Sequence, residues 1–277
     1  MDAEALKHEL LQTAAEDSEV SDERRASLTE AMLEHIGSLD PQLRDELIYE
    51  TFSQWIHQGR YSPMQLQDLL LVCLDQRHLM WFPEGNPDAV FTRAFSQLVI
   101  AEILHWHQQQ QQILTPEVVI QTAEVLIEYM HTEADRRGYV PDKGWAHAIA
   151  HLADSVKQLL GCPELRRAMV SDVLEAARDQ IGTRALVYGF GEDERLASAV
   201  VLVLERDDFS EADFARWLDT VSFERIGSEL PGDYLAAMNR KHFLRSLFFQ
   251  MRTRGVHPDL VTHVDALLRK VQQSRLG

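Results

Sequence analysis

Residues 137–154 read RGYVPDKGWAHAIAHLAD, near the middle of a chain of 277 residues. A loop rich in glycine, proline and charged residues leads at Gly144 into a predicted helix. At about 100° per residue, this helix has an apolar stripe on one face and a stripe with two histidines and an aspartate roughly opposite. The first stripe consists of Trp145, Ile149, Leu152, Val156 and Leu159, and the second of His147, His151, Asp154 and Gln158.

The flanks of this predicted helix are alanines, and from Gly144 to Val156 the only formal charge is Asp154. An amphipathic helix on a protein surface normally carries Lys, Glu and Arg on its polar side. We therefore expect a mostly buried helix whose edge with His147, His151 and Asp154 faces a groove.

Two histidines four residues apart on a helix point the same way and can reach one divalent metal ion, as in the His-Glu-x-x-His motif of metalloproteases. Here Ala148 follows His147, so the general base of that motif is missing. Asp154, three residues after His151, could be a third ligand or orient the imidazole. His147 and His151 are thus candidate metal ligands.

The same residues fit two other roles. In the first, one histidine is a general base near neutral pH, and carboxylates tune its pKa. Glu133 and Asp135 lie just upstream and are candidates to close such a site across the loop, with Arg137 and Trp145 as further ligand-binding residues. In the second, both histidines bond to backbone carbonyls and neighbouring side chains inside a stack of helices.

The central stretch resembles the signature of a bacterial family catalogued as domain of unknown function 2785. The residues that carry the resemblance are Arg137-Gly138, Gly144-Trp145-Ala146-His147, Ala150-His151 and Asp154. Weaker matches lie at Leu43-Arg44-Asp45-Glu46, Val90–Ser96, Glu192–Ala197, Asn239 and Phe243–Leu247. The resemblance covers nearly the whole chain, with Ala94 where the family is expected to have Ser. It implies an all-helical fold and no established activity.

Outside this stretch the sequence predicts one helix after another, joined by short loops. Helix starts are marked by Ser21, by the capping-box pair Ser210 and Asp213, and by prolines at the first helical position. Those prolines follow Asp40, Ser62, Asn86, Thr115, Cys162 and His257. No segment shows the sustained alternation of a strand. We expect an all-α fold, an α-solenoid of antiparallel helix pairs of HEAT or armadillo type, or alternatively a compact α/α bundle, as one domain over residues 1–277.

The charge of the chain excludes some partners. Its 44 acidic and 27 basic residues give a net charge of −17. Binding to nucleic acid or to an anionic membrane needs a basic surface, so we expect neither. No signal peptide or membrane span is evident, and the two cysteines, Cys73 and Cys162, are far apart in the sequence. These features predict a cytoplasmic protein without disulfide bonds.

Arg93 lies among large apolar residues of a predicted helix. It could clamp an anionic group, although pairing with a structural carboxylate such as Asp45 or Glu192 is the simpler expectation. A locally basic segment from Asn239 to Arg254 could likewise hold a phosphorylated or carboxylated small molecule.

Two function classes follow from the sequence. The preferred one is a binding or scaffold protein for a peptide, a protein or a small anionic ligand. The alternative is a hydrolase-like enzyme, metal-dependent or acid–base, that uses His147, His151 and Asp154.

Overall fold

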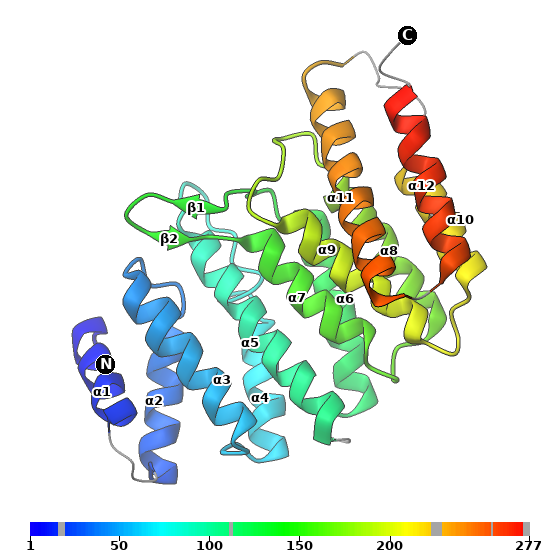
Figure 1. The fold of residues 1–277 in the computed structure, drawn as a ribbon. Coiled ribbons are helices and arrows are strands. Elements are labelled where there is room, and N and C mark those ends of the chain that lie inside the picture. The colour runs from blue at the N-terminus through cyan, green and yellow to red at the C-terminus, as the bar shows by residue number, and fades with distance from the viewer. Residues whose placement is uncertain (16–19, 111–112, 223–228, 256, 274–277) are drawn as a thin grey trace. The chain divides into compact units, whose positions relative to one another are not determined.

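The computed structural model describes the chain except for residues 16–19, 111–112, 223–228, 256 and 274–277. The described chain is mostly helical, with one small antiparallel sheet (Figure 1). It divides into two compact units, which are described separately. The first comprises residues 1–114 and 137–151, and the second residues 115–136 and 152–277. The prediction of one domain over the whole chain stays a prediction.

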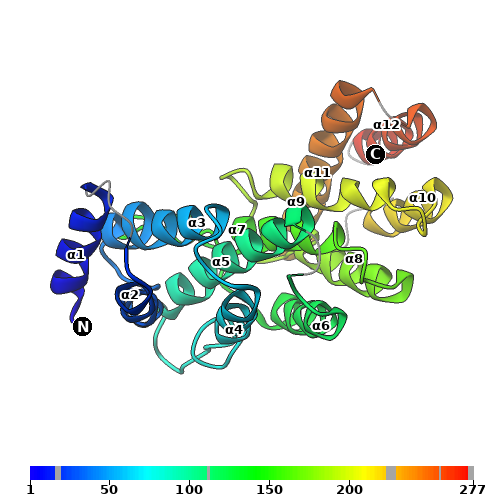
Figure 2. The same cartoon turned by 90° about the horizontal axis from the view of Figure 1, so that it is seen from below.

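The first unit is built around the long helix α5 (Ala89–Gln110), which buries side chains on most of its faces. Figures 1 and 2 show α5 beside α3 and α4, and it also contacts η1. The other elements of this unit are α1 (Ala3–Ala15), α2 (Asp22–Glu34), the π-helix η1 (Gln42–Tyr49), α3 (Glu50–His57), α4 (Pro63–Cys73), β1 (Tyr139–Val140), β2 (Gly144–Trp145) and the first turn of α7 (Ala148–Leu160).

Local capping signals fix several helix starts, as the sequence predicts. Ser21 accepts a hydrogen bond from the Arg24 backbone N–H. Ser62 forms a complete capping box with Gln65, and Pro63 is the first residue of α4. Such caps satisfy backbone N–H groups that have no partner within the helix.

The predicted helix start directly after Gly144 is wrong. Gly144 and Trp145 form β2, which pairs antiparallel with Tyr139 and Val140, and α7 begins only at Ala148. The expectation that the chain contains no strand is therefore wrong as well. His147 precedes the helix in a left-handed backbone conformation, at φ 46°. The three-residue turn of this hairpin has Asp142 at φ 65° and leads into Gly144 at φ 78°.

The second unit is entirely helical in its described residues. Its helix α11 contacts α8, α9 and α12. The elements are α6 (Pro116–Thr132), the rest of α7, α8 (Arg167–Ile181), α9 (Glu192–Val200), the 3₁₀ helix η2 (Val201–Glu205), α10 (Glu211–Val221), α11 (Gly232–Arg254) and α12 (Pro258–Gln273).

The cap residues and prolines of the sequence predict some helix starts of this chain correctly and others incorrectly. Thr115 caps α6, Ser210 and Asp213 form a capping box on α10, and α12 begins at Pro258. By contrast, α5 begins at Ala89, two residues after Pro87, and α8 begins at Arg167, four residues after Pro163. Turns separate these two prolines from their helices, because a proline fixes φ but does not by itself start a helix.

Among the described residues, none of the helices combines the length and the apolar character required to cross a lipid bilayer.

Candidate functional site

The candidate site is the hairpin of residues 137–147 together with the first turn of α7, all in the first unit. Arg44 of η1, whose side chain has no exposed surface, holds the backbone of this hairpin from its buried side. One guanidinium nitrogen donates to the Lys143 carbonyl at 2.8 Å, and another donates to the Ser38 carbonyl at 2.6 Å. Arg44 therefore connects the loop before η1 with the turn of the hairpin, 99 residues away.

The surroundings of Arg44 explain why a charge can be buried there. Its guanidinium carbon lies 4.5 Å from the centroid of the Phe91 ring and 4.7 Å from that of Phe95. Its Nε is 2.8 Å from a carboxylate oxygen of Asp45. Burial lowers the pKa of Arg44 and raises the pKa of Asp45, while their mutual attraction opposes both shifts. Cation–π contacts, carbonyls and a carboxylate together replace the lost hydration.

Two further contacts fix the hairpin. The Lys143 ammonium lies 2.7 Å from the Asp88 carboxylate, and Arg137 donates to the Pro87 carbonyl at 2.6 Å. Both partners belong to the segment just before α5. The Ala146 and His147 backbone N–H groups donate to the Gly138 and Arg137 carbonyls, so the hairpin continues one step beyond its two paired positions.

A series of rings runs from the surface into the core of the first unit. The Tyr139 and Trp145 rings pack edge to face with their centroids 5.1 Å apart, and the Trp145 ring stacks on that of His147 with a centroid distance of 4.2 Å. The ring centroids of His147 and His151 lie 5.7 Å apart, and those of His151 and Phe95 lie 5.3 Å apart. Tyr139 and Trp145 are 51% and 39% exposed, whereas the two histidines and Phe95 are buried. The histidines thus form the support beneath an exposed aromatic pair.

His151 also reaches the backbone, because its Nδ1 lies 3.1 Å from the Ala94 carbonyl oxygen of α5. At that distance the tautomer with hydrogen on Nδ1 donates a hydrogen bond to the carbonyl. This contact matches the expectation of a histidine bonded inside a helical stack. The proposed roles of His147 and His151 in metal binding or catalysis stay predictions.

Arg93 is buried on α5 in the same unit. It donates to the Trp81 carbonyl at 3.1 Å, and its guanidinium lies 4.3 Å from the centroid of the Phe82 ring. Asp45, one of the two carboxylates expected as partners of Arg93, pairs with Arg44, and a role of Arg93 in ligand binding stays a prediction.

The other predicted site residues belong to the second unit. Asp154 pairs with Arg195 of α9 at 2.6 Å. Glu133 is buried and accepts hydrogen bonds from the Tyr129 hydroxyl at 2.7 Å and from the Asp135 backbone N–H at 2.8 Å. The contacts of Glu133 hold the chain after α6 in place, and the ion pair of Asp154 connects α7 with α9.

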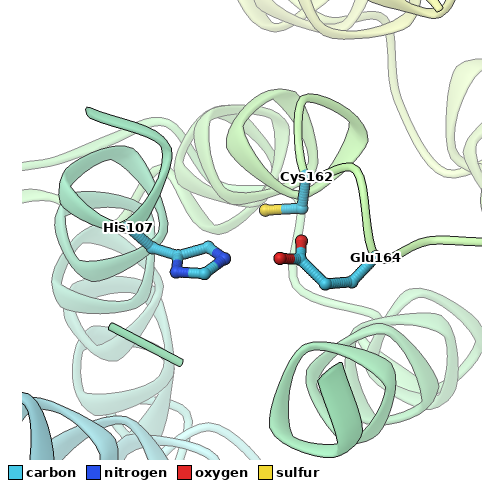
Figure 3. Close-up of side chains that lie close together, drawn as sticks. All are labelled: His107, Cys162 and Glu164. Atoms are coloured by element: carbon cyan, nitrogen blue, oxygen red, sulfur yellow. The ribbon is translucent and has the colours of Figure 1, made fainter. Parts of the chain in front are cut away.

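Figure 3 labels three side chains of types that bind metals, His107 in the first unit and Cys162 and Glu164 in the second. In the first unit, His107 accepts a hydrogen bond from the Leu114 backbone N–H at 3.2 Å. In the second unit, Cys162 and Glu164 lie within 4.8 Å of each other after α7. Burial raises the pKa of Cys162 to about 12, so this thiol is neutral at pH 7.

Reasoning from the sequence missed the parts played by Arg44, Asp88 and Tyr139. Arg44 carried one signal, because the segment Leu43-Arg44-Asp45-Glu46 is part of the family resemblance. Asp88 carried none, since its partner Lys143 is 55 residues away. Tyr139 contacts Trp145 across the hairpin, and the sequence pattern did not predict that hairpin.

Comparisons with known proteins identify the family of the chain and no individual relative. No curated protein and no solved structure matches the chain. Residues 80–249 match the family described as "Protein of unknown function (DUF2785)". This match covers the hairpin, α5 and most of the second unit, more than half of the sequence, and the chain therefore belongs to the DUF2785 family.

Proposed function

We propose that the protein is a helical binding module, and that it contacts a peptide or protein partner through Tyr139 and Trp145, here called the hairpin patch. The observation that carries this proposal is the exposure of these two aromatic side chains on a backbone that is held at several points. As part of the proposal, the helices form an α-solenoid of HEAT type, which would provide a stiff frame for the patch.

Exposed Trp and Tyr side chains are the residues that most often dominate binding energy in protein interfaces. They offer a large contact area and lose little conformational entropy, since each has only two side-chain torsions. On a monomer surface, single exposed aromatic residues are ordinary. Here two of them face each other across the strands of a short hairpin, with ring centroids 5.1 Å apart, which supports a contact surface.

The contacts beneath the patch add a second argument. Ordering a loop on binding costs free energy, and a loop that is already ordered avoids this cost. Arg44 fixes the Lys143 carbonyl, Lys143 pairs with Asp88, and His147 stacks under Trp145. The buried histidines would then serve to position Trp145.

The test uses a displayed peptide library selected against the full chain. Peptides that bind the wild type are expected to lose about thirtyfold in affinity with Trp145→Ala, as for a typical interface hot spot. Tyr139→Ala should weaken the same peptides less. Phe190→Ala is the control, because Phe190 is an exposed aromatic residue of the second unit, at 50% exposure. Peptides that bind the Trp145→Ala variant as tightly as the wild type would contradict the proposal.

A second candidate function rests on the adjacency of the two imidazole rings, whose centroids lie 5.7 Å apart. In this alternative His147 and His151 hold a divalent metal, or one of them acts as a general base, with Asp154 as helper. A bound metal would activate a water molecule for a hydrolase-like reaction. His151 would have to use Nε2, because Nδ1 faces the Ala94 carbonyl.

Elemental analysis of untagged protein separates the two candidates. The enzyme alternative predicts stoichiometric zinc, iron or manganese that is lost in the His147→Ala/His151→Ala double variant. The binding proposal predicts no stoichiometric metal in either protein and a lower melting temperature in the double variant. Asp154→Asn extends the test, since a partner of Arg195 should affect stability alone.

A further inference from the structure

A cavity of about 460 Å³ lies in the second unit, where α9 and α11 line it. The helices are fixed to each other at this point. The Ser246 hydroxyl donates to the Asp193 carboxylate at 2.6 Å, and the Gln250 side-chain amide donates to the Glu194 carbonyl at 2.8 Å. The cavity therefore lies on a stable surface, and its size is within the range of ligand-binding pockets.

Two arginines of α11, Arg245 and Arg254, line this cavity and are exposed. Within the part of the chain that the structure describes, neither has a carboxylate within ion-pair distance. Other arginines of the same unit do have one, for example Arg195 with Asp154 and Arg167 with Asp213. In a chain with a net charge of −17, two such arginines at one cavity make a local site for negative charge.

The wall between the arginines offers other contacts. Phe249 lines the cavity and is 63% exposed, so an apolar group of a ligand can cover it. The Gln250 side-chain oxygen is buried and has no hydrogen-bond donor among the described residues. A buried acceptor of this kind is costly unless a donor reaches it. The site thus combines positive charge, an aromatic surface and an acceptor for an N–H group.

The spacing of the arginines limits what can bind both. They are nine residues apart, which corresponds to about 13.5 Å along a helix axis. At about 100° per residue they also lie on opposite edges of the face that carries Phe249 and Gln250. One phosphate or one carboxylate is too small to contact both guanidinium groups. An extended peptide advances about 3.3 Å per residue, so acidic residues about four positions apart match this separation.

We propose that the cavity between α9 and α11 binds an acidic peptide segment of a partner protein. Its carboxylates pair with Arg245 and Arg254, an apolar side chain between them covers Phe249, and a backbone N–H donates to Gln250. This site is independent of the hairpin patch. Among the described residues, Glu194 is the carboxylate that lines the cavity, and it weakens the binding of an acidic ligand.

The test is a fluorescence anisotropy titration of the full chain with a fluorescein-labelled peptide, in which a Leu-Leu pair is flanked on each side by two Glu residues. Arg245→Ala and Arg254→Ala should each weaken binding by about fivefold, the upper range for an exposed ion pair. The double variant should weaken it by about twenty-five-fold, because distant sites are additive. Glu194→Gln should tighten binding, since it removes a like charge.

Arg252→Ala is the matched control. It removes the same charge from the same helix end, but Arg252 stacks on Phe248 and does not line the cavity. Trp145→Ala is the control for the hairpin patch and should leave this binding unchanged. A peptide with Gln in place of Glu should not bind. Equal losses with Arg252→Ala and Arg245→Ala would overturn the proposal, as would inorganic phosphate that binds through these arginines while the acidic peptide does not.

Discussion

Arg44 is the residue on which the candidate site depends most. It carries a full charge in a side chain without exposed surface, and it donates to the carbonyls of Ser38 and Lys143. Removing one member of a buried charged network leaves the others without partners, which costs more than the network contributes in total. The positive charge is thus tolerated only because every part of the guanidinium has a contact.

We therefore expect Arg44→Met to lower the free energy of unfolding by about 3 kcal/mol in urea denaturation. Arg44→Lys should lose most of the same stability, because an ammonium cannot stack on two rings and reach two carbonyls. The control is Arg269→Met, a surface arginine paired with Asp265, where the change should stay below about 0.5 kcal/mol. An Arg44→Lys variant as stable as the wild type would contradict this role of the Arg44 guanidinium.

Asp40 gives a prediction for acid conditions. Its hydrogen bond with Lys7 is the main reason that the pKa of Asp40 lies below the model-peptide value of 3.8. A carboxylate with a depressed pKa in the folded state stabilises the protein above its unfolded pKa. This contribution is lost as the pH falls below about 3.8 and through the folded pKa.

We expect the melting temperature of the wild type to fall further than that of Asp40→Asn between pH 5 and pH 3, because the variant has no charge to lose at this site. Thermal unfolding followed by circular dichroism at both pH values measures the difference. Asp40 also caps η1 through the Gln42 backbone N–H, and asparagine can retain that bond. The same pH dependence in both proteins would show that Asp40 contributes no acid-sensitive stability.

The hairpin is the element whose shape decides the site. Gly144 lies at φ 78°, and a Cβ atom there would meet the Arg44 guanidinium at 3.0 Å and the Pro41 Cβ at 3.1 Å. Gly85 offers a matched comparison, because it lies at φ 70° with nothing within 4 Å of the added carbon. The two positions share the backbone cost of alanine at positive φ and differ in the contact.

Gly144→Ala should therefore cost about 1 kcal/mol more in unfolding free energy than Gly85→Ala, whose own cost is about 1 kcal/mol. Urea denaturation of both variants measures the difference. Gly144→Ala should also weaken every peptide that binds the hairpin patch, whereas Gly85→Ala should not. Equal stability losses would mean that the turn moves away from Arg44 without penalty.

At the scale of the whole molecule, the path of the chain favours cooperative unfolding. The chain passes from the first unit into the second at residue 115, returns to the first unit for residues 137–151, and then enters the second again. The second boundary of this return falls inside α7. A continuous helix that belongs to both units links their folding. A single domain over residues 1–277 stays a prediction, and the cooperativity of unfolding tests it.

Scanning calorimetry should then show one transition, with equal calorimetric and van't Hoff enthalpies. Arg44→Met, a change in the first unit, should shift that whole transition to lower temperature. Two separate transitions, of which Arg44→Met moves one, would instead assign independent stability to each unit.

The sequence by itself determined the helical class and the helix starts at Ser21, Ser62, Thr115 and Ser210. It could do so because an N-cap bonds to a backbone N–H only three residues ahead. It also singled out the central stretch and predicted a mostly buried helix there.

Only the tertiary structure decided the conformation of that stretch. The hairpin needs positive φ at Asp142 and His147, which L-residues adopt only where other contacts compensate the strain. Those contacts come from Arg44, Asp88 and Pro87, each at least 50 residues away in the chain. Helical periodicity describes neighbours along one element, so it extended the helix back to Gly144 and placed Trp145 in the core, whereas distant contacts placed it at the surface.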